Sequence, residues 1–173
     1  LIQCTVMKRI GIFYGSSTGN TEAAAQAIQK ALGSEADLFN VSNTPASKVS
    51  EYANLILGTS TWGVGDLEDS MATFIDDLAK VDLSGKTVAL FGMGDQSCYG
   101  DTYCDGMGHI YEAIKDRGVT LIGAVDTDGY EHSSSIAVVN DEFVGLALDA
   151  DNQADKTDGR IATWVAAIKP KFQ

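Results

Sequence analysis

A turn rich in glycine and hydroxyl side chains follows the first apolar run of the chain. The turn reads Gly15-Ser16-Ser17-Thr18-Gly19-Asn20-Thr21, and a helical pattern begins directly after it. The start of a helix presents unpaired backbone N–H groups and the positive end of the helix dipole. The hydroxyls add donors, and Gly19 allows the backbone to approach a ligand closely. The turn therefore predicts a phosphate-binding loop.

The composition of this turn narrows the kind of phosphate. No Lys or Arg lies between Gly15 and Gln29, whereas a nucleotide P-loop places Lys and then Ser or Thr after its second glycine. The Gly-x-Gly-x-x-Gly spacing of dinucleotide-binding proteins is also absent. The turn thus favours a terminal monophosphate held without a counter-charge and without a metal. Taken alone, it is equally compatible with an ordinary capped helix after a strand.

Two further loops each place one large aromatic residue among small ones. They are residues 59–66, which contain Trp62, and residues 92–100, which contain Tyr99. Exposing a large aromatic ring is costly unless the ring meets something flat. Two such rings at one edge of a sheet would enclose a planar ring system from both sides. A terminal phosphate together with a planar ring describes flavin mononucleotide (FMN).

Apolar runs predict the strands that must bring these loops together. Continuous rather than alternating runs are typical of parallel strands covered on both faces. Four runs read as such buried strands, and a weaker run suits an edge of the sheet. The buried runs are Ile10–Tyr14, Leu55–Leu57, Val88–Phe91 and Val119–Val125, and the edge run is Ala36–Val41.

Helical patterns alternate with the strands. They are expected over Glu22–Leu32, about Ala46–Tyr52, Met71–Leu78, Tyr103–Arg117 and Gly159–Ile168. This alternation predicts an α/β, doubly wound parallel sheet with right-handed crossovers. In such a sheet, ligands bind beyond the carboxyl ends of the strands. The phosphate turn and both aromatic loops would meet there.

One stretch interrupts the alternation. Residues 126–142 contain no helical pattern, and residues 143–148 read as strand again. We interpret this as a fifth strand interrupted by a long loop. Loops of that length usually carry function or bind a partner, but a tolerated insertion without either role remains open.

Composition bounds the remaining possibilities. The 173 residues carry a net charge of −12, which argues against nucleic acid and anionic membranes and for basic protein partners. Three cysteines without a metal or disulfide pattern suit a reducing cytoplasm, and no apolar run approaches a membrane span. Residues 1–6 are expected to be an N-terminal extension, and residues 7–173 a single domain.

Together these motifs resemble the flavodoxin family, specifically its long-chain type. The resemblance covers nearly the whole chain, and the order and spacing of the motifs make it specific. The matching segments are residues 15–21, Gly58-Thr59-Ser60-Thr61-Trp62, Phe91-Gly92-Met93-Gly94-Asp95-Gln96 with Tyr99, Thr127-Asp128-Gly129-Tyr130, residues 144–149, and Asp151-Asn152-Gln153. Ser60 departs from the pattern, because the family often has Pro there.

The resemblance implies a five-stranded sheet of order 2-1-3-4-5 and bound FMN. It implies that Trp62 and Tyr99 stack on the flavin ring. The phosphate would be held by Ser16, Ser17, Thr18, Gly19, Asn20 and Thr21, and the ring edge or ribityl chain by Thr61, Gly63, Val64, Gly92, Met93, Gly94, Asp95 and Asp151. The Gly63–Val64 peptide is expected to face flavin N5 and to turn its carbonyl toward the proton that N5 gains on one-electron reduction.

The implied function is low-potential one-electron transfer between proteins. Carboxylates near the expected site, among them Asp66, Glu68 and Asp69, would oppose added electrons, and no Lys or Arg lies in residues 58–68 or 92–114. The same exposed charges would dock basic redox proteins, such as a ferredoxin/flavodoxin-NADP reductase or a low-potential oxidoreductase. A cytoplasmic monomer that is not an enzyme is expected.

Two other protein classes are weighed against this interpretation. An FMN-dependent quinone reductase of flavodoxin-like fold would need a substrate space over the ring, which Trp62 and Tyr99 would fill. A phosphate-signalling receiver domain would need acidic residues after its first strand, where this chain has Gly15-Ser16. His109 and His132 are isolated in the sequence and are expected at the surface without a catalytic role.

Overall fold

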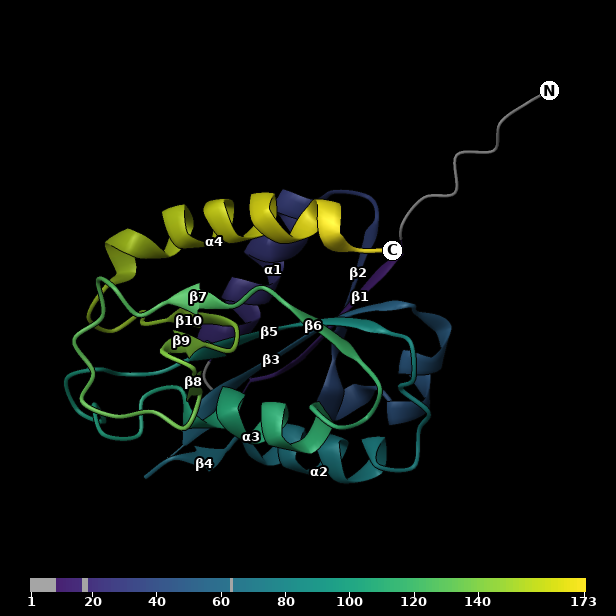
Figure 1. Cartoon of the computed structure of the whole chain (residues 1–173), viewed down its shortest axis with the longest axis horizontal. Coiled ribbons are helices and arrows are strands. Elements are labelled where there is room, and N and C mark those ends of the chain that lie inside the picture. The colour runs from purple at the N-terminus through teal and green to yellow at the C-terminus, as the bar shows by residue number, and fades with distance from the viewer. Residues whose placement is uncertain (1–8, 17–18, 63) are drawn as a thin grey trace.

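The structure, a computed structural model, describes residues 9–16, 19–62 and 64–173. Its centre is a parallel sheet with the strand order β10-β5-β3-β1-β2, in which β6 also pairs with β5 (Figure 1). The parallel strands are β1 (Ile10–Gly15), β2 (Ala36–Asn40), β3 (Asn54–Trp62), β5 (Thr87–Met93), β6 (Thr120–Ile122) and β10 (Leu146–Leu148). The short β4 (Asp66–Leu67) pairs antiparallel with the end of β3. The predicted order 2-1-3-4-5 is confirmed, since β6 and β10 share the fifth position.

Four α-helices cover the two faces of the sheet. Figure 1 shows α1 (Asn20–Leu32) and α4 (Ala154–Ile168) on one face, with α2 (Asp69–Leu78) and α3 (Asp105–Ile114) on the other. Three short 3₁₀ helices, η1 (Val41–Asn43), η2 (Ala46–Glu51) and η3 (Lys169–Lys171), complete the helical elements of the described chain. Each face has its own apolar core, one built with Ile28 and Trp164, the other with Phe74 and Ile110.

The buried strands follow from their sequences. β1 and β5 are buried at every residue, and β3 is buried over residues 54–59. A strand covered on both faces needs apolar side chains on both, which explains the continuous runs. β1 lies between β2 and β3, so β2 forms the predicted edge.

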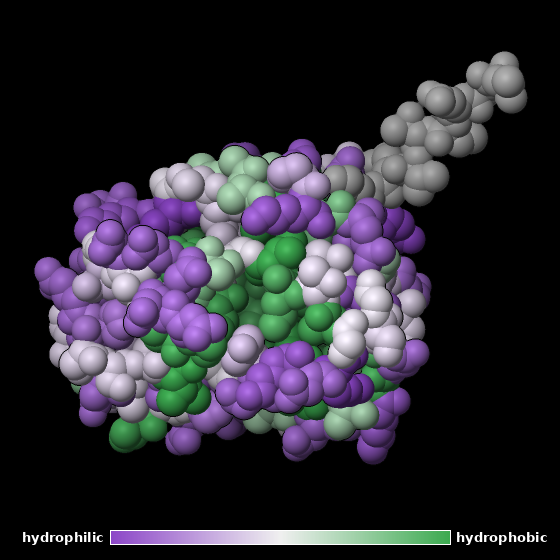
Figure 2. Space-filling view, in the orientation of Figure 1, coloured by the Kyte–Doolittle hydropathy of each residue, from purple (hydrophilic) through white to green (hydrophobic). Residues whose placement is uncertain are grey.

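The prediction of a fully buried strand over Val119–Val125 is wrong. Only Thr120–Ile122 pair with β5, and these residues are exposed or half-buried. Since β6 is an edge strand, one of its sides lacks a neighbour. Figure 2 shows an apolar hollow on this side of the molecule, between α4 and α3. Part of it is a depression of about 360 Å³ whose lining includes Val125, Leu146 and Trp164.

The interruption of the fifth strand is confirmed, but it contains regular structure of its own. Residues 123–145, called the insertion from here on, form a small antiparallel sheet of β7 (Val125–Asp126), β9 (Glu142–Phe143) and β8 (Val138–Val139). Asn140 and Asp141 both have positive φ, as a tight turn between antiparallel strands requires. The expected strand over residues 143–148 is therefore divided, since Phe143 belongs to β9 and Leu146–Leu148 pair with β5.

All four α-helices begin at residues other than those predicted, since α1 begins at Asn20 rather than Glu22 and α2 at Asp69 rather than Met71. α4 begins at Ala154, five residues before the expected Gly159. Its first turns are mostly exposed and therefore show no apolar periodicity. α3 begins at Asp105 rather than at residue 103, because Cys104 has a left-handed backbone (φ 54°) that precedes the helix.

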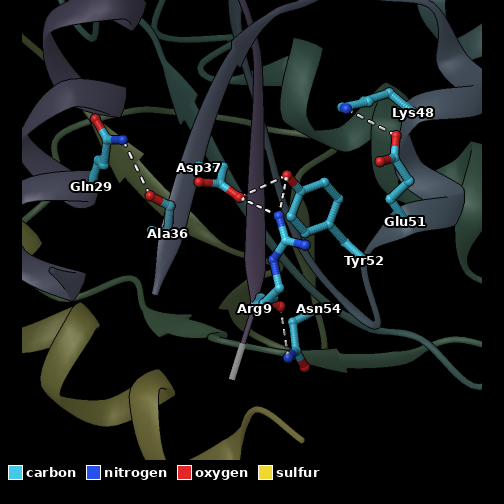
Figure 3. A network of polar contacts seen from close by, with 8 residues as sticks. All are labelled: Arg9, Gln29, Ala36, Asp37, Lys48, Glu51, Tyr52 and Asn54. Atoms are coloured by element: carbon cyan, nitrogen blue, oxygen red, sulfur yellow. Dashed lines mark hydrogen bonds and ion pairs between the residues drawn. The ribbon is translucent and has the colours of Figure 1, made fainter. Parts of the chain in front are cut away.

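A polar network joins β1, β2 and the segment after η2 at the end of the sheet away from the strand carboxyl ends. Asp37 Oδ2 accepts hydrogen bonds from Tyr52 Oη (2.7 Å) and Arg9 Nη2 (2.9 Å) (Figure 3). The Tyr52 hydroxyl and then the Arg9 guanidinium lower the pKa of Asp37, while burial followed by the Asp37 bond raises the pKa of Tyr52 to about 12. These contacts fix the start of β1.

No helix within the described ranges combines the length and the apolar character needed to cross a bilayer. The same residues contain no group of three or more His, Cys, Asp or Glu placed to hold a metal ion.

Candidate functional site: a cleft between two aromatic loops

A cleft of about 250 Å³ lies at the carboxyl ends of the central strands. It is formed by the ends of β3 and β5, the start of α1, the loop after β5 and the loop after β10. Eight of the residues predicted for the site line it, namely Asn20, Thr61, Trp62, Met93, Gly94, Asp95, Tyr99 and Asp151. Three loops that are distant in sequence thus meet at the edge where α/β sheets bind ligands.

Two large aromatic side chains are half-exposed in this cleft. Trp62 is 44% exposed and Tyr99 is 46% exposed. Trp62 ends β3, and its Nε1 donates to Ser60 Oγ (3.2 Å). Tyr99 belongs to the loop after β5, where its backbone N donates to Asp95 O (2.9 Å). The Trp62 ring is thus bonded to its own strand, and the Tyr99 backbone to its own loop, while both rings stay half-exposed and accessible to a flat ligand.

The start of α1 supplies hydrogen-bond donors beside the cleft. The first helical bond runs from Ala23 N to Gly19 O (3.0 Å), so the N–H groups of residues 20–22 precede the helical ladder. Gly19 has a φ of 91°, and no described side chain caps the helix. Gly19 N itself donates to Ser16 Oγ (3.1 Å), and Thr21 is buried. This geometry can receive an anion without a cationic side chain.

Three residues predicted for the site, Ser17, Thr18 and Gly63, lie outside the described residues. The predicted turn of the Gly63–Val64 peptide therefore stays a prediction. Five others, Ser16, Gly19, Thr21, Val64 and Gly92, are described but are not among the residues that line the cleft. Val64 is 77% exposed, and Gly92 lies within β5, where an added Cβ would be 2.8 Å from Met107 Cβ of α3.

A turn centred on Asp95 shapes the loop after β5. Asp95 Oδ1 accepts from Ser97 N and Cys98 N (both 3.0 Å) and from Asn152 Nδ2 (2.8 Å). The bond from Cys98 N, followed by that from Asn152, lowers the pKa of Asp95. A charged carboxylate is thereby held at the wall of the cleft.

Five of the lining residues, Ser60, Thr102, Tyr103, Cys104 and Ala150, were not predicted to belong to the site. Ser60 carried a signal, since it departs from the family pattern, and its hydroxyl orients Trp62. Tyr103 packs so closely that a Cβ at Gly94 would lie 2.7 Å from its ring. Tyr103 and Cys104 were expected in a helix, and no sequence pattern marks the left-handed backbone that places them beside the cleft.

The carboxylates near the cleft divide into exposed and buried groups. Asp66, Asp69 and Asp101 are exposed. Glu68, Asp105 and Asp149 are buried, and burial is the main cause that raises the pKa of Asp105. The expectation that Glu68 is an exposed charge is wrong. It is 2% exposed and caps α2, since Glu68 Oε2 accepts from Met71 N (3.0 Å).

The two histidines have different surroundings. His109 is exposed as expected, and its Nε2 lies 2.7 Å from Gly65 O, a contact between α3 and the Trp62 loop. His132 is half-buried rather than at the surface. Its ring contacts Tyr103, Tyr130 and Phe143, and burial lowers its pKa. These rings attach the insertion to the wall of the cleft.

Comparison with known proteins identifies the family. The family model described as "Flavodoxin" matches residues 12–164. The chain belongs to the flavodoxin family. It is 46% identical to a flavodoxin of Picosynechococcus sp. over 168 residues, which cover 96% of this chain and 99% of that protein. It is 44% identical to a flavodoxin of Klebsiella pneumoniae, with 94% and 98% covered.

Solved structures agree with this assignment. A crystal structure of Fusobacterium nucleatum flavodoxin bound to flavin mononucleotide is similar, with a TM-score of 0.92 and 34% identity. The match covers 96% of this chain and all of that one. Oxidised Flavodoxin 2 of Bacillus cereus matches with a TM-score of 0.74 and 28% identity, over 95% and 99% of the two chains.

The buried cap gives a testable consequence. Glu68→Ala should lower the free energy of unfolding by about 1–2 kcal/mol, because it removes the acceptor for Met71 N at the start of α2. Asp66→Ala, which removes an exposed charge two residues earlier, should change it by less than about 0.5 kcal/mol. Urea denaturation of both variants measures the difference. Equal effects of the two changes would show that Glu68 acts only through its charge.

Proposed function

We propose that the cleft binds FMN and that the protein is a low-potential one-electron carrier, not an enzyme. The observation that carries this proposal is the pair of half-exposed rings, Trp62 and Tyr99, in one cleft with the open N-terminus of α1. Flavodoxins at 46% and 44% identity over nearly their full length support the same function, as does the FMN-bound structure from Fusobacterium nucleatum.

The residues present fit this cofactor. Residues 16–21 would receive the phosphate dianion through backbone N–H groups and hydroxyls. Trp62 and Tyr99 would cover the ring, while Gly94, Asp95 and the 63–64 peptide would bind its edge. Asp151, which is exposed at the cleft, would bind the ribityl chain. FMN supplies the redox chemistry, and the protein sets its orientation and electronics.

The charge around the cleft favours a low potential. A carboxylate about 10 Å from the ring, at an effective dielectric of about 20, opposes an added electron by about 1.7 kcal/mol. For one electron this corresponds to about 70 mV. The charges of buried carboxylates are screened least by salt. Covering of the ring by Trp62 and Tyr99 would add to this effect, because it excludes the water that stabilises an anion.

The family implies that this chain passes electrons between redox partner proteins. We further infer that these partners are basic, such as a ferredoxin/flavodoxin-NADP reductase or a low-potential oxidoreductase, and that they dock on the exposed carboxylates beside the cleft. A net charge of −12 supports this partner class over nucleic acid or an anionic membrane. We also propose that the protein is a cytoplasmic monomer. We assign it to the long-chain type because of the insertion.

Selectivity for the phosphate tests the site. Thr21→Ala should weaken FMN binding by about 1.5–3 kcal/mol, as expected when a hydrogen bond to a charged group is lost. Riboflavin, which lacks the phosphate, should bind weakly and respond little to this change. Thr73→Ala, at an exposed position of α2, is the matched control. Quenching of flavin fluorescence gives both affinities, and equal wild-type affinity for FMN and riboflavin would refute a phosphate site.

Docking is tested by a pair of charge variants. Asp66→Asn with Asp69→Asn should slow electron transfer with a basic reductase several-fold at low ionic strength and flatten its dependence on salt. Asp76→Asn with Asp77→Asn removes the same charge at the other end of α2, where both residues are exposed, and should have less effect. Stopped-flow rates measure this. Equal slowing by both pairs would indicate general net charge rather than a docking face.

A further inference from the structure

A buried amide lies directly behind the loop that carries Tyr99. Gln96 follows Asp95, yet it is only 7% exposed and is not among the residues that line the cleft. Glutamine is mostly exposed in folded proteins, and burying an amide is costly unless it is hydrogen-bonded. The surroundings of Gln96 must therefore satisfy it.

The Gln96 side chain uses both of its donor hydrogens and its acceptor. Nε2 donates to Asp149 Oδ2 (2.9 Å) and to Gln153 Oε1 (2.8 Å), while Oε1 accepts from Glu131 N. The carboxylate can only accept and the backbone N–H can only donate, so the orientation of the amide is determined. Its backbone N also donates to Asp149 Oδ2 (3.0 Å).

These bonds join the loop after β5 to two other segments. Glu131 belongs to the insertion, whereas Asp149 and Gln153 are the first and last residues of the loop between β10 and α4. Gln153 extends the connection, because its Nε2 donates to Gly129 O (3.0 Å) and its Oε1 also accepts from Arg160 Nη1 (2.7 Å). The insertion is thereby tied to the back of the loop whose front carries Asp95 and Tyr99.

The hydrogen bonds within the loop after β5 are local, unlike those of the Gln96 side chain. Asp95 Oδ1 accepts from the N–H groups of Ser97 and Cys98, and Tyr99 N donates to Asp95 O. Such local bonds fix the shape of the turn. They do not determine where the turn lies relative to the cleft, which depends on contacts to other segments.

We propose that Gln96 is a positioning residue for the flavin site, which couples the insertion to the placement of Tyr99 and Asp95. Together with the bonds from Ser133 N (2.8 Å) and Ser134 N (3.0 Å) to Gly100 O, the bonds of Gln96 to residues 131 and 153 set how closely the Tyr99 loop approaches the ring. The insertion then contributes to cofactor binding without touching the cofactor. This inference rests on the proposed FMN site for its effect on affinity, but the coupling itself exists without flavin.

Gln96→Met tests the proposal, since it keeps the length and volume of the side chain but removes its hydrogen bonds. The matched control is Gln29→Met. Gln29 Nε2 donates to Ala36 O (3.2 Å) at the opposite end of the sheet (Figure 3). Hydrogen exchange of the protein without flavin is measured first. In Gln96→Met, the amides of residues 97–99 and 129–134 should lose protection together, and neither group should do so in Gln29→Met.

FMN titration and the visible circular dichroism of bound flavin give the second readout. Gln96→Met should weaken FMN binding about ten-fold and alter the flavin dichroism, whereas Gln29→Met should leave both unchanged. Loss of protection in residues 129–134 alone, with unchanged FMN affinity and dichroism, would overturn the proposal. If Gln96→Met does not fold, Gln153→Met is used instead, because it removes one acceptor of the Gln96 amide. It should cause a smaller loss of exchange protection in the same two groups of residues.

A wild-type protein that fails to bind FMN would refute the proposed function, and the exchange measurement would still decide whether Gln96 couples the two segments.

Discussion

The buried carboxylate of Asp149 is the interaction on which the site depends. It is fully buried and accepts hydrogen bonds from the backbone N–H groups of Gln96, Asp151 and Asn152 and from the side-chain amides of Gln96 and Asn152. All of these groups donate a hydrogen bond to the carboxylate, which suits its ionised form. Such a charge is tolerated in the interior only when it is fully hydrogen-bonded.

Asp149 thereby fixes the ends of two neighbouring strands to each other. It follows β10 directly, and its partners lie in the loop after β5 and in the loop before α4. Gly94 N also donates to Leu148 O (2.9 Å) at the same junction. Tyr99, Asp95 and Asp151 are carried by loops, and these loops are held at the edge of the sheet. Such an arrangement binds a cofactor with little reorganisation.

Trp62 and Tyr99 expose large apolar rings to solvent, a cost that a flat ligand bound between them would offset. The core of the protein does not need these two rings, since each face of the sheet has its own apolar cluster. The proposed cofactor site accounts for their half-exposed positions. The start of α1 is likewise left without a cap by the described side chains. The exposed rings and the uncapped helix start do not stabilise the protein without a ligand. Together they suit a ligand that combines a flat ring with a phosphate.

The sequence predicted those parts of the structure that depend on local pattern. β1, β3 and β5 are continuous apolar runs that continue into glycine-rich loops, and α1 ends at Leu32, as its pattern indicated. The aromatic pair was found because large rings in small-residue loops are unusual.

The parts that the sequence did not predict depend on tertiary partners. Glu68 and Gln96 read as polar loop residues, and only the folded chain provides the donors and acceptors that allow their burial. The polar first turns of α4 carry no apolar periodicity, and the half-exposure of β6 depends on its place at the sheet edge. The hairpin at Asn140 and Asp141 carried a weak local signal, since both residues tolerate positive φ.

A potentiometric titration of the FMN-loaded protein tests the central claim most directly. The absorption spectrum is followed under an inert atmosphere as the potential is lowered, with free FMN titrated in parallel. The account predicts one FMN per chain and two well-separated one-electron steps, the second far below the potential of free FMN. A single two-electron step near that of free FMN, with turnover of NADH and quinone in the absence of a partner protein, would contradict it and favour a quinone reductase.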